Sequence, residues 1–125
     1  MPLDPRIPEV TNIMGVRMTV YENPRLLASD NLRGCCMHSQ GRIEIDPLLC
    51  PDQQCETYWH EVLHAVAYAV EVKMDEDEVS RLARGLFQVL RANGLAFGDR
   101  EILYYQLPSN GATLTADAYV KARQE

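Results

Sequence analysis

The sequence predicts one α+β domain, in which a short antiparallel sheet is followed by two packed helices. Residues 16–46 contain short segments with alternating apolar and polar side chains, and residues 51–93 contain apolar side chains at helical spacing. A chain of 125 residues is long enough to bury one hydrophobic core. We expect an extended N-terminal arm over residues 1–15, one domain over residues 16–93 and a C-terminal extension over residues 94–125.

Three segments have the pattern of strands. Prolines at positions 2, 5 and 8 favour an extended arm before them. Residues 16–21 (VRMTVY) alternate and predict a half-buried strand. Residues 34–38 and 42–46 predict two further strands, and the Ser39-Gln40-Gly41 turn between them predicts a hairpin. We therefore expect a small antiparallel sheet, with this hairpin as its best-supported part.

The first long helix is expected to begin at Pro51-Asp52, because proline and an acidic residue suit the first helical turn. The helical pattern continues to about position 70 or 72. Its apolar side chains recur at helical spacing and predict a largely buried helix: Trp59, Val62, Leu63, Val66 and Val70.

A second helix is expected to begin near Asp75, because Asp75 and Glu78 have the spacing of a capping box. Asn93-Gly94 is a typical helix end. Beyond it the pattern is weaker and predicts a strand over residues 101–107 and a short helix over residues 116–123. The apolar stripe of the second helix is expected to face the core: Val79, Leu82, Ala83, Leu86 and Leu90.

The net charge, the apolar runs and the cysteines of the chain indicate which partners and which cellular compartment to expect. The chain has 12 basic and 18 acidic residues, a formal net charge of −6, which argues against nonspecific binding of nucleic acid. No apolar run is long enough for a signal peptide or a membrane span. We expect a cytoplasmic protein with its four cysteines reduced, and without direct contact to nucleic acid or membrane.

The segment WHEVLHA contains the pattern HExxH, formed by His60, Glu61 and His64. Residues four apart lie on one face of a helix about 6 Å apart, so two imidazoles can bind one zinc ion at about 2.0–2.1 Å each. Glu61 lies about 100° around the helix and can act as general base for a water that zinc acidifies to a pKa of about 7. The pattern predicts a zinc site with His60 and His64 as ligands and Glu61 as catalytic base.

HEVLHA on a buried helix, preceded by IEID and followed by DEDEVSRLARGL, resembles the minimal zincin-type metalloproteins of phages and prophages, which are relatives of the ImmA/IrrE-like gluzincin metallopeptidases. The resemblance covers about residues 16 to 93 and is specific at HExxH. It implies a small zincin-like domain and a glutamate early in the second helix as third zinc ligand. The family pattern places that ligand three residues before the first core position of the helix. Here the first core position is Val79, so the implied ligand is Glu76.

The sequence leaves the third ligand open. With Val79 on the inward stripe, helical phase favours Glu76, about 60° away, over Glu78, about 100° away. If the first helix runs to Val72 and the hairpin is tight, the residue opposite His64 is near position 83, and neither acid reaches the metal. One of these two glutamates can then reach the metal only if the first helix ends early or the two helices cross at a steep angle.

A cysteine is the alternative third ligand, either from the upstream pair Cys35 and Cys36 or from Cys50 or Cys55. The metzincin class is excluded, because Ala67 and Val70 stand where it requires glycine and histidine. Four tyrosines are candidates to stabilise an oxyanion, and the sequence does not select among them: Tyr58, Tyr68, Tyr104 and Tyr105.

The predicted function is zinc-dependent hydrolysis of a peptide bond in a protein substrate, for which the resemblance suggests a regulatory protein of phage or host. We expect residues 42–46 to lie near the HExxH helix and to pair with an extended substrate as an additional strand. The alternative is a non-catalytic zinc-binding or protein-interaction module, such as a phage-derived regulatory protein.

Overall fold

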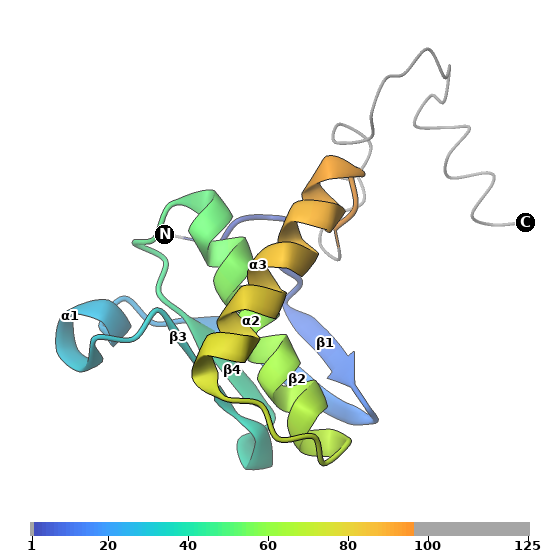
Figure 1. Ribbon diagram of the computed structural model, residues 1–125. Helices are drawn as coiled ribbons and strands as arrows, with labels where there is room; N and C mark the ends of the chain where they lie inside the picture. Colours follow the sequence, from blue (N-terminus) through green and yellow to red (C-terminus); the bar gives the residue numbers. More distant parts are fainter. Residues whose placement is uncertain (1, 97–125) are drawn as a thin grey trace, which may run out of the picture.

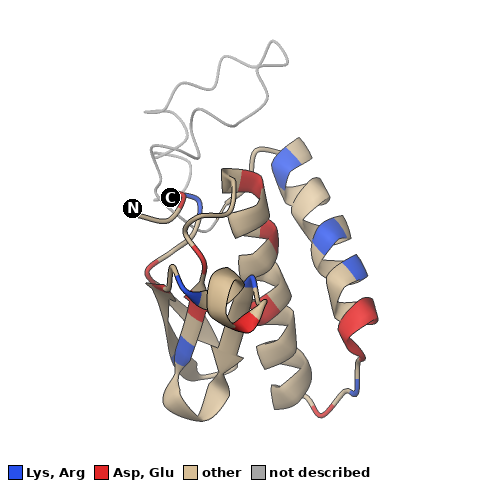
Figure 2. Ribbon diagram, turned by 90° about the vertical axis from the view of Figure 1, so that its left-hand side faces the viewer, with Lys and Arg blue, Asp and Glu red and all other residues tan. Residues whose placement is uncertain are grey.

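The computed structural model describes residues 2–96 of the chain. The α+β class is confirmed: a four-stranded sheet packs against helix α2 (Pro51–Ala69), and helix α3 (Glu76–Ala92) packs against the other side of α2. Figure 2 shows sheet, α2 and α3 as three successive layers. Among the described residues, no helix combines the length and the apolar composition needed to cross a membrane.

The sheet is mixed, so the expectation of a purely antiparallel sheet is wrong. Its strands are β1 (Val10–Ile13), β2 (Val16–Glu22), β3 (Gly34–Met37) and β4 (Arg42–Ile45), in the spatial order β1-β2-β4-β3. The predicted hairpin is confirmed, because β3 and β4 pair antiparallel. β4 then pairs parallel to β2, and β1 pairs antiparallel to β2.

A short helix that the sequence pattern did not predict, α1 (Leu26–Asp30), explains the parallel pair. It lies in the connection that carries the chain from β2 to the far edge of the sheet, where β3 forms before β4 returns beside β2. Asp46, which is fully buried, accepts hydrogen bonds from the backbone N–H groups of Leu27 and Leu48 at 3.0 and 2.9 Å. This side chain fixes α1 against the end of β4.

The helix boundaries agree with the local signals. Pro51 is the first residue of α2. The expected capping box is present at α3: Asp75 accepts from the Glu78 N–H at 2.7 Å, and the Glu78 carboxylate accepts from the Asp75 N–H at 3.0 Å. Such a cap contributes about 1 kcal/mol and fixes where α3 begins.

The core lies between the inner face of the sheet and α2. The strands contribute Met18, Ile43 and Ile45, which are fully buried, and α2 contributes Tyr58 and Val62. These side chains come from alternate strand positions and from one face of the helix, as their patterns predict. α2 is therefore held rigidly on the sheet.

The inward face of α3 differs from the predicted stripe. Val79, Ala83 and Phe87 are buried, whereas Leu82 and Leu86 are exposed. The apolar residues of α3 cover a wider arc of the helix than α2 can cover, so part of this arc faces away from the core.

The expected N-terminal arm is part of the domain. Residues 10–13 form β1, and Ile7 is buried in the core. The Asp4 N–H donates to the Gln54 side chain at 2.8 Å, and Arg6 pairs with Asp52 at 2.9 Å, so both contact the start of α2. The strand and helix predicted for residues 101–107 and 116–123 lie outside the described residues.

Candidate metal centre

Helix α2 presents His60 and His64 on one face, one turn apart. Their Nε2 atoms are 3.0 Å from each other. The side chain of His60 is 16% exposed and that of His64 is 32% exposed, so both rings are mostly covered while their Nε2 atoms remain close together. The rigid helix thus brings two potential ligand atoms to one point.

Glu76, the first residue of α3, faces both rings. Its Oε1 lies 2.6 Å from Nε2 of His60, and its Oε2 lies 3.0 Å from Nε2 of His64. One ligand atom from each of the three residues lies within 4.8 Å of the others. The Glu76 side chain is 73% exposed, so the cluster is open to solvent on the side of α3.

The path of the chain between the helices explains how Glu76 reaches His64. α2 ends at Ala69, and Glu71 adopts a left-handed conformation with φ 59° that reverses the chain. Residues 72–75 then run without helical structure. An extended residue advances about 3.3 Å and a helical residue only 1.5 Å, so this short segment returns to the level of His64 before α3 begins.

The two helices consequently pair in a regular antiparallel register. One turn beyond Glu76, the Ser80 hydroxyl lies 3.3 Å from Nδ1 of His60. One turn further, Arg84 pairs with Glu56 at 3.3 Å. When Nδ1 of His60 donates to Ser80, Nε2 carries the lone pair that a metal ion requires. In that tautomer, Ser80 would orient the His60 ring for metal binding.

The donor set fits zinc. Imidazole nitrogen and carboxylate oxygen are ordinary zinc ligands, and two ligands of a tetrahedral zinc ion with bonds of about 2.0–2.1 Å lie about 3.4 Å apart. The observed separations of 2.6 to 3.0 Å between the three groups need to widen by about 0.4 to 0.8 Å for this geometry. The role of His60, His64 and Glu76 as ligands stays a prediction.

The competing third ligands lie elsewhere. Glu78 uses its carboxylate for the capping box with Asp75. None of the four cysteines belongs to the cluster formed by residues 2–96. Burial raises the pKa of Cys36 to about 11, so its thiol is protonated at neutral pH in the metal-free chain.

Glu61 lies at the junction of the sheet and α2. The residue is 6% exposed, and burial together with the neighbouring Glu76 carboxylate raises its pKa to about 8. A methyl group at Gly34 of β3 would come 3.4 Å from Oε2 of Glu61. The carboxylate thus faces the backbone of β3 at its first residue.

Two adjoining pockets, here named the larger and the smaller lobe of a groove, are both lined in part by this residue. The larger lobe has a volume of about 920 Å³, and its lining includes His38, His64 and Tyr68. The smaller lobe has a volume of about 280 Å³, and its lining includes Asn31 and Arg84. The two lobes share four lining residues, Leu32, Gly34, Glu61 and Glu76. A ligand that occupies both lobes would therefore cross Glu61.

The edge strand beside this groove is β3. The strand expected to pair with substrate, at residues 42–46, is β4, and it is internal because β2 and β3 pair with its two sides. It has no free edge, so that expectation is wrong. β3 is at the end of the strand order, and Gly34, Cys35 and Cys36 line the larger lobe.

Two of the four candidate tyrosines can be placed. Tyr58 is 1% exposed, and its hydroxyl lies 2.6 Å from that of Thr11 in the core, so it is excluded as an oxyanion donor. Tyr68 is exposed, lines the larger lobe, and has its ring centre 4.5 Å from that of His38. Tyr104 and Tyr105 lie outside the described residues.

Sequence reasoning missed three residues of this site: Ser80, Gly34 and His38. Ser80 follows Glu76 by one helical turn, a spacing that points it toward the same neighbour. No local signal marks Gly34 or His38, because their positions depend on how β3 packs on α2.

No protein-family model, curated protein or solved structure matches this chain.

Gly34 offers a test of the contact between β3 and α2. A Cβ at position 34 would lie 2.6 Å from Cγ2 of Thr57 and 2.9 Å from the backbone oxygen of Glu44. We expect Gly34→Ala to lower the free energy of unfolding by about 1–3 kcal/mol through overpacking, measured by urea denaturation. Adding Thr57→Ser, which removes Cγ2, should restore part of the loss. Equal stability of Gly34→Ala and wild type would contradict the contact.

Proposed function

We propose that this protein is a zinc-dependent metallopeptidase of the gluzincin type. The observation that carries the proposal is the position of Glu76, whose two carboxylate oxygens lie 2.6 and 3.0 Å from the Nε2 atoms of His60 and His64. Three protein ligands are the usual number for a catalytic zinc, with one coordination position left for water or substrate. Zinc bound there would polarise the substrate carbonyl and acidify water.

Glu61 is the general base in this proposal. Burial and the charge of Glu76 raise its pKa to about 8, so the carboxyl is mostly protonated at neutral pH in the metal-free chain, and in its ionised form it is a stronger base than an exposed glutamate. A divalent cation beside Glu76 would offset the second of these causes. Glu61 accepts a proton from the attacking water and passes it to the amine that leaves when the peptide bond breaks.

The substrate we propose is an extended segment of a protein. Within residues 2–96, β3 is an edge strand beside the groove, and an extended peptide can add to such an edge through backbone hydrogen bonds. The residues on the two sides of the cleaved bond would occupy the two lobes, with Glu61 between them. The larger lobe, which includes Tyr68 and Val72, suits a bulky apolar side chain.

The test combines metal analysis with a cleavage assay on the full chain. Protein stripped with a chelator and then titrated with zinc is expected to bind one zinc ion per chain, and to regain cleavage of an unfolded protein substrate, detected by mass spectrometry of the fragments. Failure to bind zinc would refute the proposal at its first step.

A non-catalytic zinc module is the competing function. It predicts four protein ligands, whereas the cluster within residues 2–96 has three. Stoichiometric zinc without cleavage of any unfolded protein, together with a fourth protein ligand detected by X-ray absorption spectroscopy, would favour it.

A further inference from the structure

The two lobes of the groove differ in the charged side chains that line them. Arg33 and Arg84 line the smaller lobe together with Asn31, whereas no arginine lines the larger lobe. Arg33 lies between α1 and β3, and its carbonyl oxygen accepts a hydrogen bond from the Asp46 N–H at 3.0 Å. Asn31 ends α1 in a left-handed conformation with φ 54°. The backbone that carries Arg33 is therefore held in place at this lobe.

The acidic groups of the smaller lobe have partners other than Arg33 or are buried. Glu56 pairs with Nε of Arg84 at 3.3 Å. Glu76 faces the two histidines of the metal centre, and Glu61 is buried. Within residues 2–96, no carboxylate forms an ion pair with Arg33. Arg33 is therefore an exposed cation at the lobe without an acidic partner in the described part of the chain.

Both arginines have the chemistry that binds a carboxylate. A guanidinium group has five N–H donors in a planar fork, and it can bind a carboxylate through two parallel hydrogen bonds. Arg84 contacts Glu56 through Nε, and its side chain remains 65% exposed. Two guanidinium groups at one lobe can thus bind a carboxylate that is supplied by another molecule.

An extended peptide on the edge of β3 would bring single side chains to this lobe, because successive side chains of a strand point to opposite sides. The chain as a whole has a net charge of −6, so its overall field does not attract an acidic substrate. A preference for a carboxylate would therefore come from contact at the lobe. It would depend on the position of the acidic residue in the peptide and not on the total charge of the peptide.

We propose that Arg33 and Arg84 make the smaller lobe a binding site for a carboxylate of the protein substrate. An Asp or Glu side chain near the cleaved bond and a C-terminal carboxyl group offer the same chemistry to a guanidinium group. The inference rests on the proposed peptidase function. Arg33 has the larger effect on substrate preference, because Arg84 already contacts Glu56.

The experiment uses the full chain loaded with zinc and a decapeptide with a phenylalanine at its centre, since the larger lobe suits a bulky apolar side chain. Each other position carries either a single Glu or a single Gln. A second series is shortened from its C-terminal end one residue at a time, and each length is made with a free carboxyl group and with an amide. We expect kcat/KM to be about three- to tenfold higher for Glu than for Gln at one position, because a charged contact in a partly exposed groove contributes modestly. A difference confined to the acid and amide pairs would identify a C-terminal carboxylate as the group that is bound.

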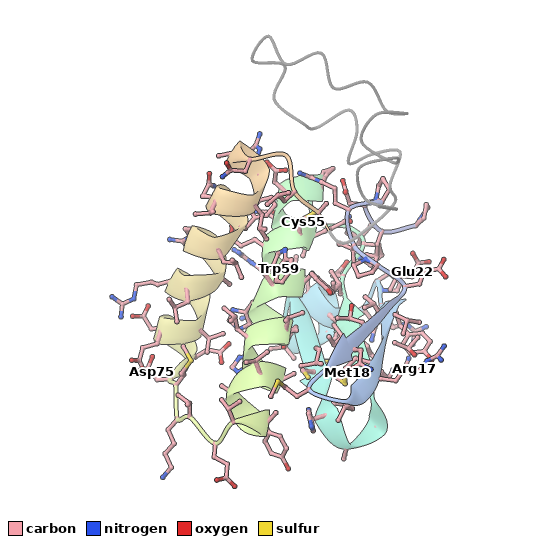
Figure 3. The ribbon with its side chains drawn as sticks, turned by 90° about the vertical axis from the view of Figure 1, so that its right-hand side faces the viewer. Arg17, Met18, Glu22, Cys55, Trp59 and Asp75 are labelled. Atoms are coloured by element: carbon pink, nitrogen blue, oxygen red, sulfur yellow. The ribbon has the colours of Figure 1, made fainter. Side chains whose placement is uncertain are left out.

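Substitutions of the arginines test which side chain is responsible. Arg33→Gln should bring the Glu/Gln ratio close to one, and Arg33→Glu should reverse it in favour of Lys at the same position. Arg84→Gln should lower the ratio less. Arg17→Gln is the matched control and should leave the ratio unchanged, because Arg17 is exposed on β2 and lines neither lobe. Figure 3 shows Arg17 at the sheet, on the side of the molecule away from α3.

The same peptides keep this inference separate from the proposed function. Cleavage of none of them would count against the peptidase proposal. The Kd of each peptide for the zinc-loaded chain, measured by fluorescence anisotropy, would then still compare Glu with Gln and acid with amide. Equal values within every pair would overturn the carboxylate site. A preference that Arg33→Gln and Arg84→Gln both leave intact would overturn it as well.

Discussion

Replacing Glu61 with glutamine is expected to lower kcat for peptide hydrolysis by about 10² to 10⁴-fold, the usual contribution of a positioned general base. Glutamine keeps the size of the side chain but cannot accept the proton of the attacking water. Since Glu61 is not among the three clustered ligand groups, the zinc content of the variant should equal that of the wild type. The measurement is kcat on the substrate identified by the cleavage assay, with zinc quantified in the same samples.

Glu71→Gln is the matched control for this variant. Glu71 is an exposed glutamate in the turn that follows α2, outside both lobes of the groove, so the same chemical change there should leave kcat within about twofold. Full activity of Glu61→Gln with normal zinc content would show that another group accepts the proton. Loss of zinc from Glu61→Gln would instead mean that Glu61 contributes to the metal site.

The helices could be predicted because their signals are local. The capping box joins Asp75 and Glu78, only three residues apart, and its two hydrogen bonds form whatever the rest of the fold does. Pro51 at the start of α2 is equally local. The inward face of α3 was predicted less well, because the apolar positions span a wide arc and only the packing on α2 decides that Phe87 is buried and Leu82 is not.

The order of the strands could not be predicted, because it depends on contacts between residues far apart in the sequence. Alternation identifies β2 and β4 as strands, but which strands are neighbours depends on the connection through α1 and the contact of Asp46 with it. This order makes β4 an internal strand and puts β3 at an edge of the described sheet, so the expected substrate pairing at residues 42–46 is wrong.

The candidate metal site also has one part that local spacing predicts and one part that depends on the path of the chain. His60, Glu61 and His64 lie within one helical turn, and their spacing alone predicts a common face. The approach of Glu76 depends on residues between the helices: α2 ends at Ala69, earlier than expected. Periodicity measures rotation around a helix and contains no information about the path of a connecting segment.

Glu76→Gln should therefore weaken zinc binding more than any other single change in the acidic segment before Val79. Structural zinc sites with four ligands bind with about 10–16 kcal/mol, so losing one anionic ligand should cost about 3–4 kcal/mol, or 10² to 10³-fold in Kd. Competition with a chromophoric chelator gives this Kd directly. His60 and His64 remain in the variant, so weak binding of zinc should persist.

Glu78→Gln is the control that decides between the two glutamates. Glu78 is two residues away, and glutamine can still accept the hydrogen bond from the Asp75 N–H. The variant should therefore lose only the small contribution of a negative charge at the helix N-terminus, and keep its zinc affinity. Equal Kd values for Glu76→Gln and wild type, or a larger loss in Glu78→Gln, would contradict the path of the chain through residues 72–75. The comparison therefore tests the turn after α2 as directly as the metal site, because only that turn places Glu76, and not Glu78, opposite His64.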